Sequence, residues 1–319
     1  MLKKDLSFLR CPYCGFSFYL HLVVKGTTNA IEYGTVYCRC DEFPIIHSIL
    51  YLYKKRHKEI VRFLQSGNTF MALQYALPRK FVRFIITPSF VHWFGLTGVQ
   101  HIIGIFHNLT YYIHRDQESE SLLIFFPYSF WADRSRGKRC VWLDVGSGIK
   151  NYYHEIRNIN PAIRIIALEQ SFLNIFLSRC IEKKNANICY VCADAAAGLF
   201  VQSHSLDVLT CHDAFPFMAQ QKAIIRYFCA MVKKTGMLSI ASIPEHQYLP
   251  FWSSVYPLYR SVLRTFFPSK PTFVNEATLL SMVSDEKIDL QKATTHDRDQ
   301  VFRYMCLWPS IVGKKLYKN

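Results

Sequence analysis

A run of apolar residues that ends in an acid and two glycines has the composition of a nucleotide-binding turn. Residues 141–145 are apolar except for Asp144, and Gly146 and Gly148 follow them directly. Glycines at this point let the chain turn sharply and let a ligand approach the backbone. A second apolar run ends about twenty residues later at Glu169. Strand, glycine turn, helix, strand and acid together predict a βαβ unit, with Glu169 placed to hold ribose hydroxyl groups.

The glycine pattern differs from that of dinucleotide-binding proteins, because residue 151 is Asn151 rather than a third glycine. Asp144, two residues before the first glycine, completes the pattern D-x-G-x-G. With this motif, residues 138–308 resemble the class I S-adenosylmethionine-dependent methyltransferases. The resemblance implies an α/β fold with a Rossmann-like seven-stranded methyltransferase sheet, and a carboxylate that stabilises the ammonium of the cofactor's methionine part. A Gly-Ser-Gly loop in an unrelated α/β fold is the alternative.

The resemblance also assigns the residues that hold the cofactor. Asp194, an acid at the end of the third core strand, is expected to accept a hydrogen bond from the adenine amino group. The N–H of Ala195 is expected to donate to a nitrogen of the adenine ring. Asp194 is equally placed to cap the turn that follows, and the two roles are compatible. The cofactor-binding residues expected from the resemblance are Asp144, Gly146, Ser147, Gly148, Glu169, Gln170, Asp194, Ala195 and Asp213.

His212 and Asp213 come at the end of the fourth expected strand, at the edge where open α/β sheets bind ligands. Methyl transfer from a sulfonium is an in-line displacement, which mainly requires alignment of the two reacting atoms. A base is needed only when the acceptor is a hydroxyl, a carbon acid or an ammonium. His212 is the candidate catalytic base, because its reference pKa lies near 6.5. The alternative, which we favour, is an orienting role for His212 and Asp213 beside the cofactor.

Four cysteines near the N-terminus have the paired spacing of a metal site. Cys11 and Cys14 form a C-x-x-C pair, and Cys38 and Cys40 form a tighter C-x-C pair. Four thiolates on two hairpins can surround a structural Zn²⁺ ion, which would stabilise a segment too small for a large core. Because a C-x-C pair is unusually tight, His47 or a water is an alternative ligand.

The residues around the second cysteine pair resemble the second half of zinc ribbons that precede some bacterial methyltransferase domains. A similar ribbon occurs in 23S rRNA guanine methyltransferases, which raises the possibility of an RNA substrate. We expect a small N-terminal zinc ribbon at 1–53, a helical extension or lid at 54–136, a class I methyltransferase core at 137–310 and a basic tail at 311–319. Strands at 287–290 and 301–308 are expected to complete the edge of the sheet.

The composition of the chain limits where the protein can be located and which partners it can bind. The net charge of +15 admits an anionic partner, but the basic residues are dispersed along the 319-residue chain. Residues 84–106 contain no charged side chain, yet one proline and three glycines argue against a stable membrane span there. Peripheral membrane contact stays open. The start of the chain has no signal-peptide pattern, and the scattered remaining cysteines fit a reducing compartment, so we expect a cytoplasmic protein.

Three functions fit these observations. We favour methyl transfer to a small-molecule acceptor, because aromatic residues gather at 54–136 and 244–273 while basic residues are spread out. Methylation of RNA is supported by the net charge and by the ribbon. The third function is that of a catalytically inactive binding or scaffold module.

Overall fold

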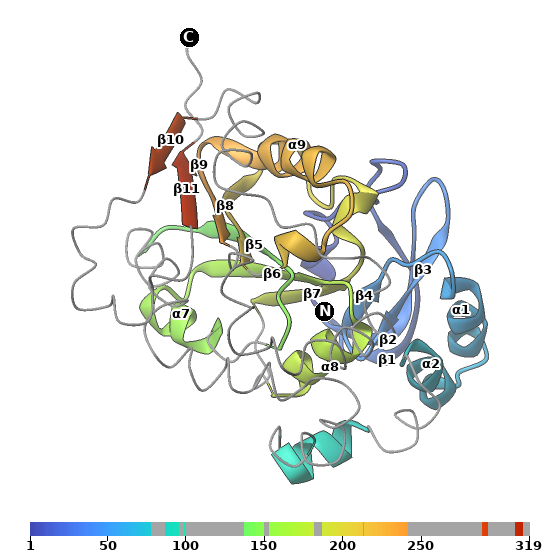
Figure 1. The fold of residues 1–319 in the computed structure, drawn as a ribbon. Helices are drawn as coiled ribbons and strands as arrows, with labels where there is room; N and C mark the ends of the chain where they lie inside the picture. Colours follow the sequence, from blue (N-terminus) through green and yellow to red (C-terminus); the bar gives the residue numbers. More distant parts are fainter. Residues whose placement is uncertain are drawn as a thin grey trace, which may run out of the picture.

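The computed structural model describes residues 1–77, 87–95, 99, 137–149, 153–181, 187–212, 214–241, 289–292 and 310–314. They form a mixed α/β fold in which helices cover both faces of one sheet (Figure 1). The strands are β1 Tyr19–Gly26, β2 Ile31–Tyr37, β3 Glu42–Ile46, β4 Ile49–Tyr51, β5 Cys140–Val145, β6 Ile163–Glu169, β7 Ile188–Cys192, β8 Leu206–His212, β9 Val232–Ala241, β10 Asp289–Lys292 and β11 Ser310–Lys314. The α-helices are α1 His57–Gln65, α2 Thr69–Ala76, α7 Tyr153–Ile159, α8 Phe172–Ile181 and α9 Gln221–Met231, and the short 3₁₀ helices are η1 Lys3–Asp5, η2 Ala195–Ala197 and η3 Phe215–Phe217.

The described strands form a single sheet in the order β1-β2-β3-β4-β7-β6-β5-β8-β9-β11-β10. From β4 to β9 in this order the strands run parallel to one another. The pairs from β1 to β4 and from β9 to β10 are antiparallel. The order reverses between β5 and β8, which is where an open α/β sheet places its ligand crevice. The seven strands from β7 to β10 have the Rossmann-like arrangement that the sequence predicted, and the N-terminal antiparallel part of the chain carries the four cysteines.

Alternate side chains of the strands feed two separate apolar cores, one on each face. On β5, Leu143 and Val145 join the core that α9 covers, whereas Trp142 joins the core beneath α7 and α8 (Figure 1). Both faces of these strands are buried, which explains why the sequence shows continuous apolar runs there rather than alternation.

The ribbon strands continue the same alternation rather than enclosing a core of their own. On β4, Leu50 belongs to the α9-side core, and Ile49 and Tyr51 belong to the α8-side core. β3 and β4 are joined by a two-residue turn in which His47 and Ser48 both have positive φ, of 51° and 66°. This is the geometry of a type I′ hairpin. A segment too small to bury much surface alone is therefore stabilised by sharing both cores of the large sheet.

The fifth core strand, β9, begins at Val232, directly after α9 ends at Met231. The edge of the sheet differs from the sequence-based expectation. The edge strand β11 covers 310–314, part of the segment expected to be a tail, while the expected strand at 301–308 lies outside the described residues. The uncharged segment 84–106 and most of the expected lid also lie largely outside them. None of the described helices has both the length and the apolar composition that a membrane span requires.

Candidate functional site

The glycine turn after β5 is held tightly against two neighbouring segments. Gly146 and Ser147 both donate their N–H groups to the carbonyl of Leu168 on β6, over 2.8 and 3.0 Å. Gly146 has φ of 69°, and a Cβ there would overlap the Cβ of Ala214, which follows β8. Gly148 also has a positive φ, of 59°. Position 146 therefore admits only a residue without a side chain, and the backbone of the turn lies at the crevice between β5 and β8.

Asp144 lies completely buried beneath this turn and is held on both sides. The Tyr153 hydroxyl at the start of α7 donates to its Oδ2 over 2.6 Å. The Thr210 hydroxyl on β8 donates to its Oδ1 over 2.8 Å, and accepts from Trp142 Nε1 over 3.0 Å. This network connects β5, β8 and α7, so the carboxylate is fixed in orientation at the base of the glycine turn.

Two further groups at the turn have the properties of a binding site. Ser147 is completely buried, and its hydroxyl has no hydrogen-bond partner within the described part of the chain. Glu169, at the end of β6, accepts from the N–H of Gly148 over 2.9 Å and from the N–H of Ser171 over 2.8 Å. A buried polar group without a partner costs free energy, which a polar ligand would offset.

The residues expected to bind the adenine follow the carboxyl ends of β6 and β7. Asp194 is exposed, and its Oδ1 accepts from the N–H of Ala196 over 2.9 Å, which confirms that it caps η2. Ala195 is buried beside it, and Gln170 is exposed after β6. The carbonyl of Gln170 accepts a long contact, 3.6 Å, from Cys192 Sγ. The ends of β6 and β7 are therefore tied together below the site.

His212 and Asp213 are described only in part. His212 is the last residue of β8 and pairs with Ala241 of β9. Asp213 lies outside the described residues, as does the position of the His212 side chain. The backbone of His212 lies at the carboxyl edge of the sheet, two residues before Ala214, which lies against the glycine turn.

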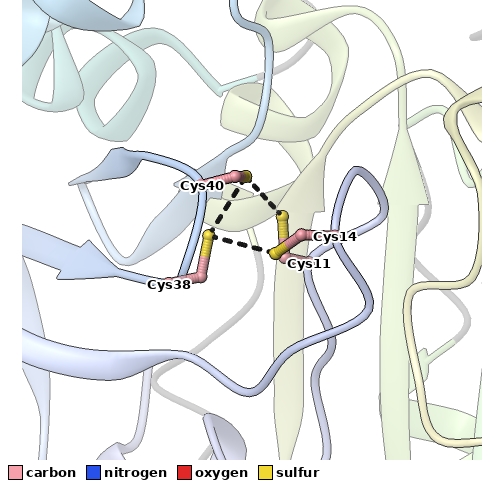
Figure 2. Close-up of side chains that lie close together, drawn as sticks. All are labelled: Cys11, Cys14, Cys38 and Cys40. Atoms are coloured by element: carbon pink, nitrogen blue, oxygen red, sulfur yellow. Dashed lines mark hydrogen bonds between the residues drawn. The ribbon is translucent and has the colours of Figure 1, made fainter.

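The four N-terminal cysteines converge on one point, as Figure 2 shows. Their sulfurs all lie within 4.8 Å of one another. The closest pairs are Cys38–Cys40 at 3.5 Å, Cys11–Cys40 at 3.6 Å and Cys14–Cys38 at 3.7 Å. A tetrahedral site with Zn–S bonds of about 2.3 Å would place its sulfurs about 3.8 Å apart, so the four thiols fit the ion. The alternative ligand His47 is not part of this cluster, because its Nε2 lies 3.7 Å from Cys180 Sγ instead.

The sequence of the central strands matches a known protein family. Residues 143–240 match the family described as a methyltransferase domain. This part of the chain is a methyltransferase domain. The match covers the glycine turn, Glu169 and Asp194, and the methyl donor of this domain is S-adenosylmethionine.

The chain also resembles several solved structures. One is a chain from the complex between the Haloferax volcanii Trm112 methyltransferase activator and a methyltransferase, at 14% identity and a TM-score of 0.46, covering 64% of this chain and 95% of that one. The YcgJ protein of Bacillus subtilis matches at 14% identity and a TM-score of 0.44, covering 60% and 98%. Phosphoethanolamine N-methyltransferase 2 of Haemonchus contortus with S-adenosyl-L-methionine matches at 14% and 0.40, covering 56% and 49%. Comparison with curated proteins gives no match.

Sequence reasoning missed three residues that support the methyltransferase site. Tyr153 and Thr210 hold Asp144, and Trp142 holds Thr210. Thr210 gave a signal, since it is the one hydroxyl residue among the apolar side chains of 208–211. Tyr153 gave none, because its partner is nine positions away across a turn.

Proposed function

We propose that the protein transfers a methyl group from S-adenosylmethionine to a small-molecule acceptor at the carboxyl edge of β5 and β8. The observation that carries the proposal is the buried Ser147 hydroxyl without a described partner, in a turn where Gly146 and Ala214 leave no room for a side chain. A buried polar atom without a partner, in a turn with no room for another side chain, is what a bound polar cofactor would complete.

The cofactor, when bound, supplies a methyl group on a sulfonium that leaves readily. The chain's own residues bind and align it. We assign Gly146, Ser147 and Gly148 to the amino-acid part, with Asp144 supplying the negative charge for its ammonium. Glu169 would accept from the ribose hydroxyls with the carboxylate that now accepts from the N–H of Gly148.

The adenine would lie at the outer end of the site. We assign it to Gln170, to Asp194 and to the N–H of Ala195 at the ends of β6 and β7. Asp213, which follows β8, is assigned to the cofactor through its position in the chain. These assignments extend along one edge of the sheet, in the strand order β8, β5, β6 and β7.

The acceptor would lie beside His212, where β8 ends. His212 would act as a base if the acceptor is a hydroxyl, a carbon acid or an ammonium, and would only orient the acceptor otherwise. Aromatic residues are frequent in the sequence at 54–136 and 244–273, which favours an acceptor pocket lined by aromatic side chains. Such a pocket suits a small apolar molecule.

RNA is the second candidate acceptor, and one surface of the ribbon supports it. Phe16, Tyr19 and Tyr37 expose 48, 57 and 47% of their area. The rings of Tyr19 and Tyr37 stack with centroids 5.5 Å apart, and the Arg39 guanidinium lies 5.1 Å from the centre of the Phe16 ring. Exposed aromatic rings beside cations are the groups on which unpaired bases stack.

The same proposal includes the metal and the organisation of the chain. We assign Cys11, Cys14, Cys38 and Cys40 as ligands of one structural Zn²⁺ ion, on the basis of their sulfur separations. The chain would consist of the ribbon at 1–53, the extension at 54–136, the core at 137–310 and the tail at 311–319, with β11 extending the core into that tail.

Native mass spectrometry of the purified protein tests the cofactor and the metal together. The expected spectrum shows one zinc per chain and an adduct with the mass of S-adenosylmethionine or S-adenosylhomocysteine. Isothermal titration with S-adenosylmethionine should give heat that the double variant D144N/G146A no longer gives. Absence of heat for the zinc-loaded wild type would support a scaffold module and refute the enzyme.

Incubation of a cell extract with methyl-radiolabelled cofactor then identifies the acceptor class. Label in the metabolite fraction supports a small-molecule acceptor. Label in the RNA fraction, together with RNA binding that weakens steeply as salt rises, supports the RNA alternative instead.

A further inference from the structure

The first cysteine pair lies against the segment that follows β7. Arg10, just before Cys11, donates its N–H to the carbonyl of Phe200 over 2.8 Å, and Leu9 forms a bridge with Val201. The carbonyl of Pro12, between the two cysteines, fills the space that a side chain at Gly198 would need. The cysteine loop is therefore packed against residues 198–201, directly after Asp194 and η2.

The last ribbon strand approaches the same place from the other side. β4 pairs in parallel with β7, with Tyr51 opposite Cys192, and the N–H of Leu52 donates to the carbonyl of Cys192 over 2.9 Å. Because both strands run in the same direction, the pairing carries Tyr53 to the level of Asp194. The cysteine loop contacts the residue that follows β4, since the Tyr13 hydroxyl donates to the carbonyl of Leu52 over 2.7 Å.

The Tyr53 side chain lies on the α8 side of the sheet. Residues two apart on a strand face the same side, and the rings of Tyr51 and Tyr53 lie 5.6 Å apart. Tyr53 is only half-buried and packs against the α8-side core. The pairing of β4 with β7 places Tyr53 beside the strand ends assigned to adenosine. Burial raises the pKa of its hydroxyl, and the negative charges of Asp194 and Glu169 act in the same direction.

We propose that the cysteine ribbon forms one wall of the adenosine site, and that Tyr53 is the ribbon residue that contacts the adenine ring. The inference rests on the proposed function, which assigns Glu169 and Asp194 to adenosine. Its consequence is that cofactor affinity depends on the folded, metal-loaded ribbon and not on the methyltransferase core alone. The ribbon then acts in cis, by fixing Tyr53 and the 194–201 segment in place.

Titration of the zinc-loaded protein with S-adenosylhomocysteine measures this contribution. The variant Y53A should bind about 5-fold to 150-fold more weakly, the range found when one aromatic partner of a nucleobase is removed. Y53F should bind as the wild type does, because the ring and not the hydroxyl makes the contact. F8A is the matched control, because Phe8 is a partly exposed ribbon aromatic whose ring lies 4.3 Å from Arg164 near the start of β6, away from the strand ends assigned to adenosine, so binding should be unchanged.

Adenosine alone serves as a second probe. If Tyr53 contacts the adenine, Y53A weakens adenosine and S-adenosylhomocysteine by the same factor. A loss confined to the larger ligand would locate the effect at its homocysteine part and would overturn the inference. Y53L keeps the apolar bulk and replaces Y53A in these titrations if Y53A does not give a cooperative thermal transition with one bound zinc.

Removal of zinc with a chelator tests the contribution of the ribbon without a mutation. The affinity for S-adenosylhomocysteine should fall by at least the factor found for Y53A and return when zinc is restored. Unchanged affinity in both Y53A and the zinc-free protein would refute the ribbon's role while leaving the proposed function intact. A wild type that binds no S-adenosylhomocysteine with zinc in place would refute the proposed function itself.

Discussion

Replacing Thr210 by valine should destabilise the protein far more than the small change in shape suggests. Thr210 is completely buried on β8, where its hydroxyl donates to Asp144 and accepts from Trp142. Valine has nearly the same shape, so the packing is kept and only these two hydrogen bonds are lost. The variant therefore isolates the polar network beneath the glycine turn.

The two lost bonds set the size of the effect. A hydrogen bond to a charged group contributes about 1.5–3 kcal/mol, and a buried N–H left without a partner costs about 1–3 kcal/mol. Because the two bonds share one hydroxyl and their energies are not additive, we expect a loss of about 3 kcal/mol in the free energy of unfolding. For a chain of this length the melting temperature should fall by roughly 4–6 °C.

Thr35 on β2 provides a matched control for this substitution. It is also completely buried in a strand, but its hydroxyl has no hydrogen-bond partner among the residues that the structure describes. Thr35→Val should therefore leave the melting temperature within about 2 °C of the wild type, or raise it, because an unpaired buried hydroxyl is removed. Both variants are compared by differential scanning calorimetry at one protein concentration. Equal transitions for the two variants would show that the network around Asp144 contributes nothing to stability.

Two other perturbations test the glycine turn and the buried histidine. Gly146→Ala should abolish calorimetric binding of S-adenosylmethionine, because the added Cβ would overlap that of Ala214. For His47, burial and then the charge of Arg179 lower its pKa to about 4. An unfolded histidine binds a proton below about 6.5, so the unfolded state binds more protons between these two values. Stability should therefore fall as the pH is lowered from about 6.5 to 4, by up to about 3 kcal/mol from this group, as denaturant titrations would show.

Each of these two predictions has its own control. Gly67 has φ of 75° and open space around it, so Gly67→Ala carries the same backbone strain without the overlap and should keep full cofactor binding. For the histidine, Asn tolerates the positive φ of the turn and does not titrate, so His47→Asn should flatten the dependence between pH 4 and 6.5. Equal cofactor binding by the two alanine variants, or an unchanged pH slope in His47→Asn, would contradict the reasoning.

The methyltransferase core was predictable because its signals are local. Apolar runs followed by an acid or a glycine end β5, β6 and β7, and a nearby turn fixes each of those strand ends. Asp194 was predicted to cap the turn after β7, and it does, because an N-cap depends only on the next few residues. The domain match confirms this part of the sequence analysis.

The convergence of the four cysteines was also predictable, since ligand spacing reflects the geometry of the ion. The fit of zinc and the roles of the individual cofactor residues stay predictions. The attachment of the ribbon to the sheet could not have been read from the sequence. It depends on the pairing of Ile49 with Tyr190, and both strands are equally apolar runs with no marker of their partner. Long-range partners of polar residues, such as Thr210 for Asp144, escape sequence reasoning for the same reason.

The parallel pairing of β4 with β7 has a consequence for synthesis of the chain. Leu50 pairs with Val191, so β4 leaves the ribosome about 140 residues before its partner exists. At typical translation speeds of about 5–20 residues per second, an apolar edge waits roughly 7–30 seconds without a neighbour. During that interval the newly made N-terminal hairpins present an unsatisfied strand to the cell. Binding of a metal ion by these hairpins, or of a chaperone to the exposed strand, would then determine how much of the newly made protein folds.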